Sequence, residues 1–370
     1  MLTEEQQMPR DAARDWARER SPVAALRRLR DSGDGRGFDP ALWAEMGQMG
    51  WTGVLVPEAH GGSDFGFSAL ALVLAETGRT LTASPLLSTA VIGASALTLA
   101  GSEAQQAAWL PRIASGEAVV ALAVEEGPHH APERIALLAE PADGGWRLAG
   151  EKRFVPEGGD ADLFIVAARG AGEPDAITLF LVPADAASAT PRRMADSRGW
   201  ADVRFDAALA DDAVLGEVGA GRPVLEAVLD RARVALAAEM LGSAAEAFEI
   251  TLAYLKTRTQ FGQLIGGFQA LQHRAAQMFT QLELARSCVE AAAAAVDAGA
   301  PDLPLLASLA KAKANDVLHL VSNEMVQMHG GIGMTDEHEA GFYLKRARTA
   351  EALYGSSAWH RDRYARLAGF

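Results

Sequence analysis

Apolar residues recur at three- and four-residue spacing over most of the first 117 residues, as in helices with one buried face. Glycine and proline interrupt this pattern and separate the predicted helices. A loop is predicted at residues 54–66. The helical segments read FDPALWAEMGQMGW, SALALVLAETGRTL, TAVIGASALTLAG and EAQQAAWLPRIASG. This pattern predicts an N-terminal helical domain over residues 1–117.

The pattern changes after residue 117 to short apolar runs that are typical of β-strands. Turn sequences such as PADGG and PEGGDA separate these runs. The runs read AVVALAVEE, RIALLAE, GWRLAGEKRFV, ADLFIVAAR and AITLFLVPAD. We therefore expect a middle β domain over residues 118–222.

Helical periodicity returns at residue 223 and continues to the end of the sequence. The pattern predicts long helices at residues 224–258, 267–297 and 304–329, followed by a last pair of helices. Alanine-rich helices of this length usually pack together as a bundle. The fold class predicted from the pattern is mainly α with a central β module, and residues 223–370 form its C-terminal four-helix bundle.

The composition narrows the class of protein. Apolar residues make up 49% of the 370 residues and charged residues 22%, which is ordinary for a globular protein. The net charge of −14 argues against nucleic-acid binding, which needs a basic surface. No apolar run reaches the roughly 18 residues of a membrane helix, and the N-terminus lacks the apolar core of a signal peptide. We expect a cytoplasmic protein without membrane or nucleic-acid partners.

Cysteine and histidine chemistry adds little to the picture. The single cysteine, Cys288, lies in an alanine-rich helical segment and excludes an internal disulfide. His129 and His130 lie in a loop between glycine and proline, where solvent-exposed histidines are the usual finding. We expect no metal site.

Two stretches of the bundle carry residues suited to a phosphorylated ligand. The first, KTRTQFGQLIGGFQALQH at residues 256–273, places an arginine, a phenylalanine and glutamines at a break between helices. The second, QMHGGIGMTDEHE at residues 327–339, contains glycines that let the backbone approach a ligand closely. Together the two stretches are a stronger signal than either one alone.

The sequence resembles the acyl-CoA dehydrogenase family over essentially its whole length. LVPEAHGG, SPLLSTA, WLPRIASGE, the β module and the RTQFG…FQ…QMHGGIG bundle occur in the order of that family. The resemblance implies an N-terminal helical domain, a middle β-barrel-like domain and a C-terminal four-helix bundle. It also implies FAD at subunit interfaces, an acyl-CoA substrate and an electron-transfer flavoprotein as the electron acceptor.

The resemblance assigns roles to individual residues. Arg233 matches the family position that meets coenzyme A, and Phe154 takes the place of a tryptophan beside the flavin ring. Ser356 belongs to the pair of residues that follows the catalytic position and is assigned to the cofactor. The FAD tail is assigned to Arg258, Phe261, Gln269, Gln327 and Gly331.

The catalytic base does not match the family pattern. Tyr354 occupies the position at which the family usually has a glutamate, and Ala232 occupies the alternative position on the first bundle helix. A tyrosine with an unperturbed pKa of about 10 is ionised to only about one part in a thousand at pH 7. Two other carboxylates stay open as alternative bases: Glu239 follows Ala232 by about two helical turns on the same face, and Asp230 is nearer but on a different face. The residues expected beside the flavin ring also differ from the family pattern, because Pro156 has no hydrogen-bond donor where a polar residue is expected. Glu126 in the β module does match that pattern.

Three functions stay open at this stage. The first is an FAD-dependent acyl-CoA dehydrogenase that lacks its own glutamate and acts with a partner subunit, sharing FAD in a heterotetramer with a second acyl-CoA dehydrogenase-like chain. Steroid-degrading members of the family resemble this case. The second is a catalytically silent structural subunit of such a dehydrogenase. The third is a flavin oxidase or monooxygenase on the same scaffold, which needs no α-proton removal. The first function also has an alternative form, a self-sufficient dehydrogenase with an unrecognised base, assembled as a homo-oligomer.

Overall fold

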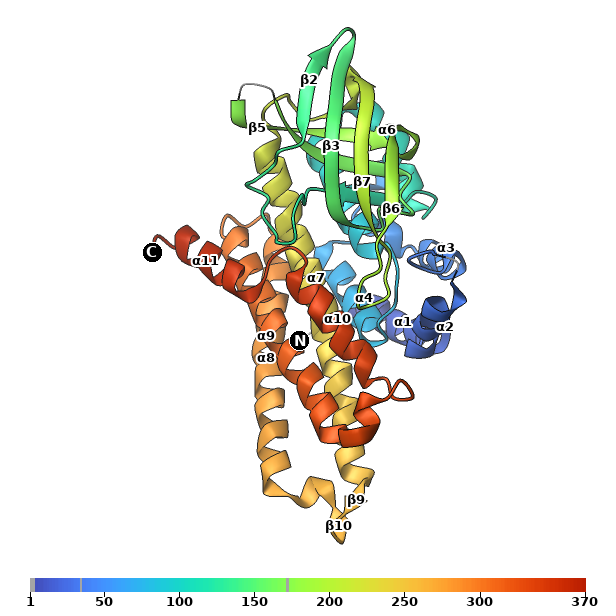
Figure 1. Cartoon of the computed structure of the whole chain (residues 1–370), viewed down its shortest axis with the longest axis vertical. Coiled ribbons are helices and arrows are strands. Elements are labelled where there is room, and N and C mark those ends of the chain that lie inside the picture. The colour runs from blue at the N-terminus through green and yellow to red at the C-terminus, as the bar shows by residue number, and fades with distance from the viewer. Residues whose placement is uncertain (1–3, 34, 171–172) are drawn as a thin grey trace. The chain divides into compact units, whose positions relative to one another are not determined.

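The computed structural model describes residues 4–33, 35–170 and 173–370, which form two compact units. The first unit contains the described residues up to Arg27 together with residues 67–82 and 233–370. The second contains the described parts of residues 28–66 and 83–232. Each unit therefore combines segments that are far apart in the sequence. The predicted fold class, mainly α with a central β module, is confirmed (Figure 1).

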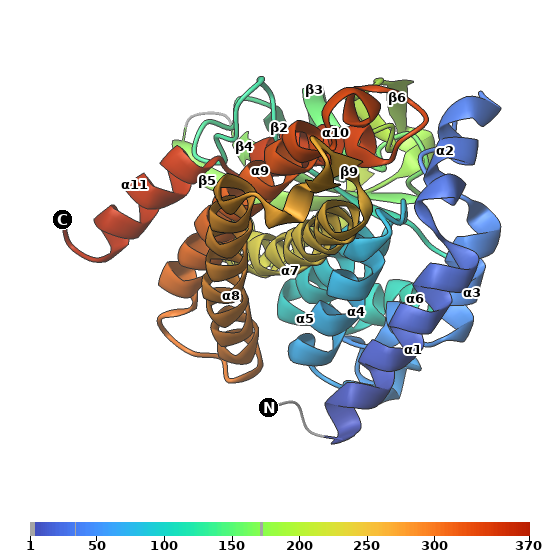
Figure 2. The ribbon, with the colours of Figure 1, turned by 90° about the horizontal axis from the view of Figure 1, so that it is seen from below.

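The first unit is built from long helices. Two helices contribute residues to both units, α2 (Val23–Ser32) and α7 (Gly221–Thr257). In Figures 1 and 2, α8 and α9 run side by side. The other elements of this unit are α1 (Glu4–Arg20), α4 (Phe67–Arg79), β9 (Thr259–Gln260), β10 (Gln263–Leu264), η6 (Ile265–Gly267), α8 (Gln269–Asp297), α9 (Leu303–His329), η7 (Gly330–Met334), α10 (Ala340–Ala352) and α11 (Ser357–Leu367). The long helices agree closely with the predicted segments.

Two glycines let α4 and α7 approach each other closely in the first unit. A Cβ at Gly242 of α7 would lie 1.8 Å from the carbonyl oxygen of Ala75. A Cβ at Gly78 of α4 would lie 2.2 Å from that of Glu239. Larger residues fit at neither position without separating the helices. Ser243 Oγ adds a hydrogen bond of 2.8 Å to the Gly78 carbonyl.

The second unit combines short helices with an eight-stranded sheet. The helices are α3 (Pro40–Gln48), η1 (Trp51–Gly53), η2 (Glu58–His60), η3 (Leu86–Gly93), α5 (Ala94–Ala100), α6 (Glu103–Ala114), η4 (Ala184–Ala186) and η5 (Asp211–Ala213). The strands are β1 (Val120–Ala123), β2 (Leu138–Ala142), β3 (Gly145–Pro156), β4 (Leu163–Gly170), β5 (Glu173–Pro183), β6 (Ala187–Pro191), β7 (Trp200–Ala210) and β8 (Val214–Leu215).

The strand order is β6-β7-β3-β2-β4-β5-β8, and β1 pairs with β4 in parallel. Figure 1 shows β6, β7, β3 and β2 beside one another in this order. Five apolar runs predicted strands, and the structure adds β6, β7 and β8. The alternation in β7 is regular, because Val203, Phe205, Ala207 and Leu209 are buried while their neighbours are more exposed. Phe164 and Phe205 meet edge to face in this core, with ring centroids 5.7 Å apart.

One predicted helix has an unexpected form. Residues 86–93 form a π-helix, η3, before α5 continues as an ordinary α-helix. This segment packs directly on β1, since a Cβ at Gly93 would lie 2.9 Å from the Cβ of Val120. Thr89 Oγ1 also accepts a hydrogen bond of 3.0 Å from the Val120 N–H. π-turns of this kind are rare and occur most often near functional sites.

Within residues 4–33, 35–170 and 173–370, no helix is both long and apolar enough to cross a membrane.

The glycine contact between α4 and α7 gives a testable prediction for stability. Gly242→Ala places a methyl group against the Ala75 carbonyl, and we expect it to lower the free energy of unfolding by about 2–4 kcal/mol. Gly341→Ala is the matched control, because a Cβ at Gly341 in α10 meets nothing within 4 Å. The control should be neutral or stabilising by up to about 1 kcal/mol. Urea unfolding of both variants measures this, and equal effects would contradict the prediction.

Candidate functional site

The loop between α10 and α11 carries Tyr354, the residue at the predicted catalytic position. Tyr354 has a φ of +56° and Gly355 a φ of +116°. A left-handed conformation costs a residue other than glycine roughly 1–2 kcal/mol, so the surrounding structure must hold it. The Tyr354 side chain is only 5% exposed. Ser356 follows as the N-cap of α11, and its Oγ accepts the Trp359 N–H at 3.3 Å.

Side chains from two helices hold the Tyr354 carbonyl oxygen. His360 Nε2 on α11 lies 3.1 Å from this oxygen and donates to it. Arg233 Nε on α7 donates at 3.5 Å. Arg233 is fully buried, and its guanidinium lies 4.8 Å from the centre of the Trp359 ring. The structure thus brings Arg233 and Tyr354 together, while the contact of Arg233 with coenzyme A stays a prediction.

The next carbonyl, that of Gly355, is held by α9. Lys311 Nζ and Asn315 Nδ2 both donate to it at 3.2 Å. Lys311 also donates to the Ala350 carbonyl at 3.0 Å and to Asn315 Oδ1 at 2.5 Å. Burial lowers the pKa of Lys311 well below its usual range. Sequence analysis missed this lysine, because lysines are rarely fully buried.

The alternative carboxylate on α7 is engaged elsewhere. Arg346 of α10 donates to Glu239 Oε1 through Nη2 at 2.8 Å and through Nε at 3.1 Å. Both side chains are buried. Removal of either partner would leave a buried charge without its counterion. Ala232, at the other family position for the base, is fully buried.

The first predicted ligand stretch forms an exposed hairpin of β9 and β10 after α7. Phe261 at its tip has a φ of +54° and is 89% exposed, and its ring meets that of Phe268 edge to face at 6.1 Å. Arg258 is also exposed. Its carbonyl accepts the Ile265 N–H at 2.9 Å, which closes the hairpin. Gln269 begins α8 directly after this segment.

The second predicted stretch ends α9 and forms the turn η7. Gln327 lines a surface hollow of about 450 Å³ together with Arg274 and Gly330. Gly331 is exposed, and a Cβ there would meet nothing within 4 Å. The backbone of this turn is therefore open to an approaching ligand.

An aromatic stack connects the hairpin end of α7 to this turn. The His329 ring lies 4.3 Å from the ring of Tyr254 and 4.3 Å from that of His338. His329 Nδ1 donates to the Met325 carbonyl at 2.7 Å. Burial lowers the pKa of His329 and of His338, so both rings are neutral at pH 7.

Phe154 lies in the second unit, at a bulge in β3. The register with β7 shifts between Lys152 and Val155, and Phe154 has a φ of +51°. Its N–H donates to Asp202 Oδ1 at 3.2 Å, and the Arg192 guanidinium lies 4.7 Å from its ring centre. The hydrogen bond from Arg192 lowers the pKa of Asp202 most strongly, and the hydrogen bond from the Phe154 N–H lowers it further. The Phe154 backbone is thus held by Asp202, and its ring packs against Arg192.

Sequence analysis found Glu126 but missed its partner. Lys152 of β3 is fully buried and donates to Glu126 Oε1 at 2.6 Å and to the Val124 carbonyl at 3.2 Å. Glu126 also accepts the N–H groups of Ala136 and Leu137 at 2.8 and 2.9 Å. Burial lowers the pKa of Lys152, although Glu126 opposes that shift. The pair fixes the loop between β1 and β2.

Comparison with known proteins decides the family. The N-terminal, middle and C-terminal domains of acyl-CoA dehydrogenase match residues 3–117, 131–212 and 219–368. The chain belongs to the acyl-CoA dehydrogenase family. The family's members are FAD-dependent dehydrogenases, and the family resemblance of the sequence is confirmed.

Three relatives span nearly the whole chain. The acyl-CoA dehydrogenase IpdE2 of Mycobacterium tuberculosis is 30% identical over 356 residues, covering 95% of this chain and 94% of its own. The steroid ACAD Tcur3481-Tcur3483 superimposes with a TM-score of 0.89 at 32% identity, covering 99% and 98%. The ChsE4-ChsE5 complex from Mycobacterium tuberculosis superimposes with a TM-score of 0.91 at 25% identity, covering 100% and 99%.

The residues of this acyl-CoA dehydrogenase family member fit the tail of FAD. An exposed arginine and an exposed aromatic ring suit a diphosphate and an adenosine, and the open turn at Gly331 suits close backbone approach. The ring side is poorer in donors, because Pro156 has no N–H. Phe154, predicted to lie beside the ring, has an apolar side chain suited to stacking. When bound, FAD supplies the hydride acceptor for the family reaction.

The buried lysine gives a prediction for pH dependence. Lys311 titrates near pH 10.4 in an unfolded chain and lower in the folded one. Between these pKa values the unfolded chain binds more protons, so the free energy of unfolding rises with pH. We expect Lys311→Met to reduce this rise at pH values below about 10.4, as measured by urea unfolding. Lys313→Met on the same helix is the control, and it should keep the wild-type slope.

Proposed function

We propose that this chain takes part in the α,β-dehydrogenation of an acyl-CoA thioester without supplying the catalytic carboxylate. It would act with a second acyl-CoA dehydrogenase-like chain that supplies the base. The single observation that carries this proposal is that a phenol, that of Tyr354, stands at the position that the family resemblance assigns to the base, on a loop with two carbonyls held by buried donors.

The reaction needs a base that a tyrosine replaces poorly. The α-proton of the thioester goes to a carboxylate while the hydride from Cβ goes to FAD, leaving a trans-2-enoyl-CoA. A carboxylate is ionised at neutral pH, whereas an unperturbed phenol is almost entirely protonated. Glu239 is a poor replacement for the missing base, because its carboxylate accepts two hydrogen bonds from Arg346. We infer that the base comes from another chain.

The distribution of cofactor residues supports a shared FAD. Arg258, Phe261, Gln327 and Gly331 are exposed in the first unit and suit a dinucleotide tail. On the side assigned to the flavin ring, Phe154 can stack, but Pro156 offers no polar donor. A chain with a complete tail site and an incomplete ring site is suited to complete the FAD site of its partner. We propose an electron-transfer flavoprotein as the acceptor, by analogy with the family.

The names of the relatives support the substrate class and the assembly. ChsE4-ChsE5 is a complex of two differently named components, and Tcur3481-Tcur3483 is a steroid ACAD. These relatives favour a heteromer that acts on the coenzyme A ester of a steroid-derived acid. Bulky apolar substrates of this kind need a large apolar pocket rather than specific polar contacts.

The flavin content of the purified chain tests the shared site. We expect the isolated chain to contain far less than one FAD per chain, as measured by visible absorption together with the native mass. Co-expression with an acyl-CoA dehydrogenase-like chain from the same source should restore a yellow heteromer. A homotetramer with about one FAD in every chain would contradict the proposal.

A pair of substitutions tests the base. Tyr354→Glu in the isolated chain should leave turnover of octanoyl-CoA, and of a steroid side-chain acyl-CoA, at the level of Tyr354→Gln. These two variants differ only in charge, so they separate base chemistry from packing. A properly seated flavin that lacked only a base would instead gain about 10²–10⁴-fold with glutamate. Such a gain would identify a self-sufficient flavin site.

A further inference from the structure

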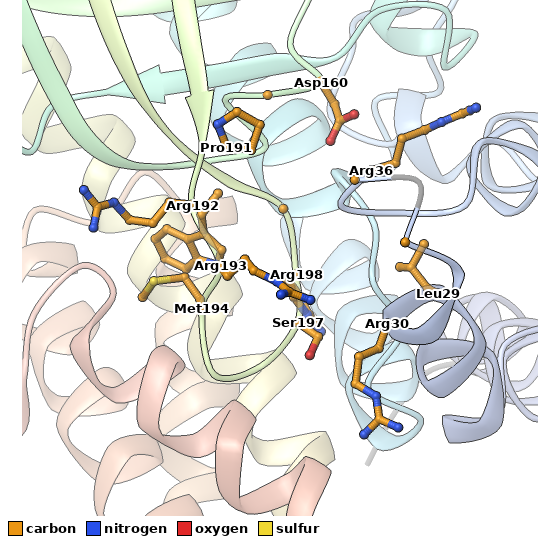
Figure 3. A pocket seen from close by; sticks show the side chains of 15 residues that line it. Leu29, Arg30, Arg36, Asp160, Pro191, Arg192, Arg193, Met194, Ser197 and Arg198 are labelled. Atoms are coloured by element: carbon orange, nitrogen blue, oxygen red, sulfur yellow. The ribbon is translucent and has the colours of Figure 1, made fainter.

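A basic pocket of about 420 Å³ lies in the second unit, and its lining includes none of the residues assigned to FAD or to the catalytic position, although its Arg192 also contacts the Phe154 ring. Three segments line it: the end of α2 with the residues that follow, the turn after β3, and the loop between β6 and β7. In Figure 3, Arg30 and Arg36 lie on one side of the pocket, and Arg192 and Arg193 on the other. Its volume is in the range of small-molecule sites.

Backbone contacts hold the frame of this pocket. A Cβ at Gly37 would lie 2.3 Å from the Cα of Gly199, so these two segments touch through their backbones. The Gly37 N–H donates to Asp160 Oδ2 at 3.0 Å, and the Glu157 N–H donates to the Gly199 carbonyl at 3.0 Å. The loop is closed by the Arg192 N–H, which donates to the Trp200 carbonyl at 2.7 Å. A preformed frame lowers the entropic cost of binding a ligand.

The charges of the lining residues are mainly positive. Among the described residues that line it, five are arginines and one is a carboxylate, in a protein whose net charge is −14. Asp160, the lining carboxylate, is engaged by the Gly37 N–H. The lining arginines are Arg30, Arg36, Arg192, Arg193 and Arg198.

These arginines differ in their partners. Arg30 pairs with Asp31, and Arg192 pairs with Asp202. Arg193 is exposed, and within residues 4–33, 35–170 and 173–370 its side chain has neither a hydrogen bond nor an ion pair. Its guanidinium is thus available to an incoming anion at no cost in existing contacts. Guanidinium groups bind phosphate oxygens through paired hydrogen bonds, which is why arginine is common in phosphate sites.

Apolar side chains form the rest of the lining. Leu29, Pro191, Met194 and Trp200 contribute to it alongside the arginines. We propose that this pocket binds a small organic phosphate, with the phosphate at Arg193 and an apolar moiety against Met194 and Trp200. A concave site of this size with a few charged groups fits a small molecule better than a polypeptide surface, which needs a larger interface.

Calorimetry on the full chain in a phosphate-free buffer of low ionic strength tests the proposal. Phenyl phosphate is the probe, because it combines the phosphate with an aromatic ring and does not resemble the tail of FAD. We expect Arg193→Ala to weaken its binding about tenfold or more, since a charge-assisted contact is lost. Arg193 is exposed, so the variant should unfold at the wild-type temperature.

Arg134→Ala is the matched control, because Arg134 is an exposed arginine of the same unit outside the pocket. It should bind phenyl phosphate with the wild-type affinity. Inorganic phosphate forms a second arm: weaker binding than that of phenyl phosphate supports an organic ligand, and equal binding assigns the site to free phosphate. Absence of binding at millimolar phenyl phosphate, or equal losses in Arg193→Ala and Arg134→Ala, would overturn the proposal.

Discussion

The close approach of α4 and α7 is the constraint on which the first unit depends. Gly242 and Gly78 each face a carbonyl of the opposite helix, so the two backbones touch. Glu239 is fixed on α7 by this contact, and its ion pair with Arg346 fixes α10 in turn. Since α10 ends at Ala352, two residues before Tyr354, two glycines far away in the sequence help to place the catalytic loop. Small residues at a helix crossing therefore have an effect well beyond their own contacts.

Periodicity predicted the fold class and the long helices because each helix buries a continuous face. The predicted segments at residues 267–297 and 304–329 differ from α8 and α9 by no more than two residues at either end. The strand β7 was harder to predict, although its alternation is regular, because Ala201 and Ala207 on its buried face and the alanines on its exposed face weaken the contrast. Its place in the sheet comes from pairing with β3 and β6, which is long-range information.

The candidate site also has a part that local sequence predicts and a part that depends on long-range contacts. Local sequence order was enough to find the hairpin with Phe261 and the glycine turn, because each is a single short motif. The donors around Tyr354 could not be found, since Arg233 lies 121 residues before it and Lys311 is a fully buried lysine. Patterning assigns lysine to the surface. The buried residues Lys152 and Lys311 were not predicted for this reason. Each of them donates hydrogen bonds that hold a loop.

The donors around the catalytic loop all hold main-chain oxygen atoms. His360 and Arg233 bind the carbonyl of Tyr354, and Lys311 and Asn315 bind that of Gly355. None of these four bonds involves the side chain at position 354. These bonds thus fix the backbone at position 354 without depending on which side chain it carries. In evolutionary terms, the position of a catalytic group and the chemistry of that group can be inherited separately.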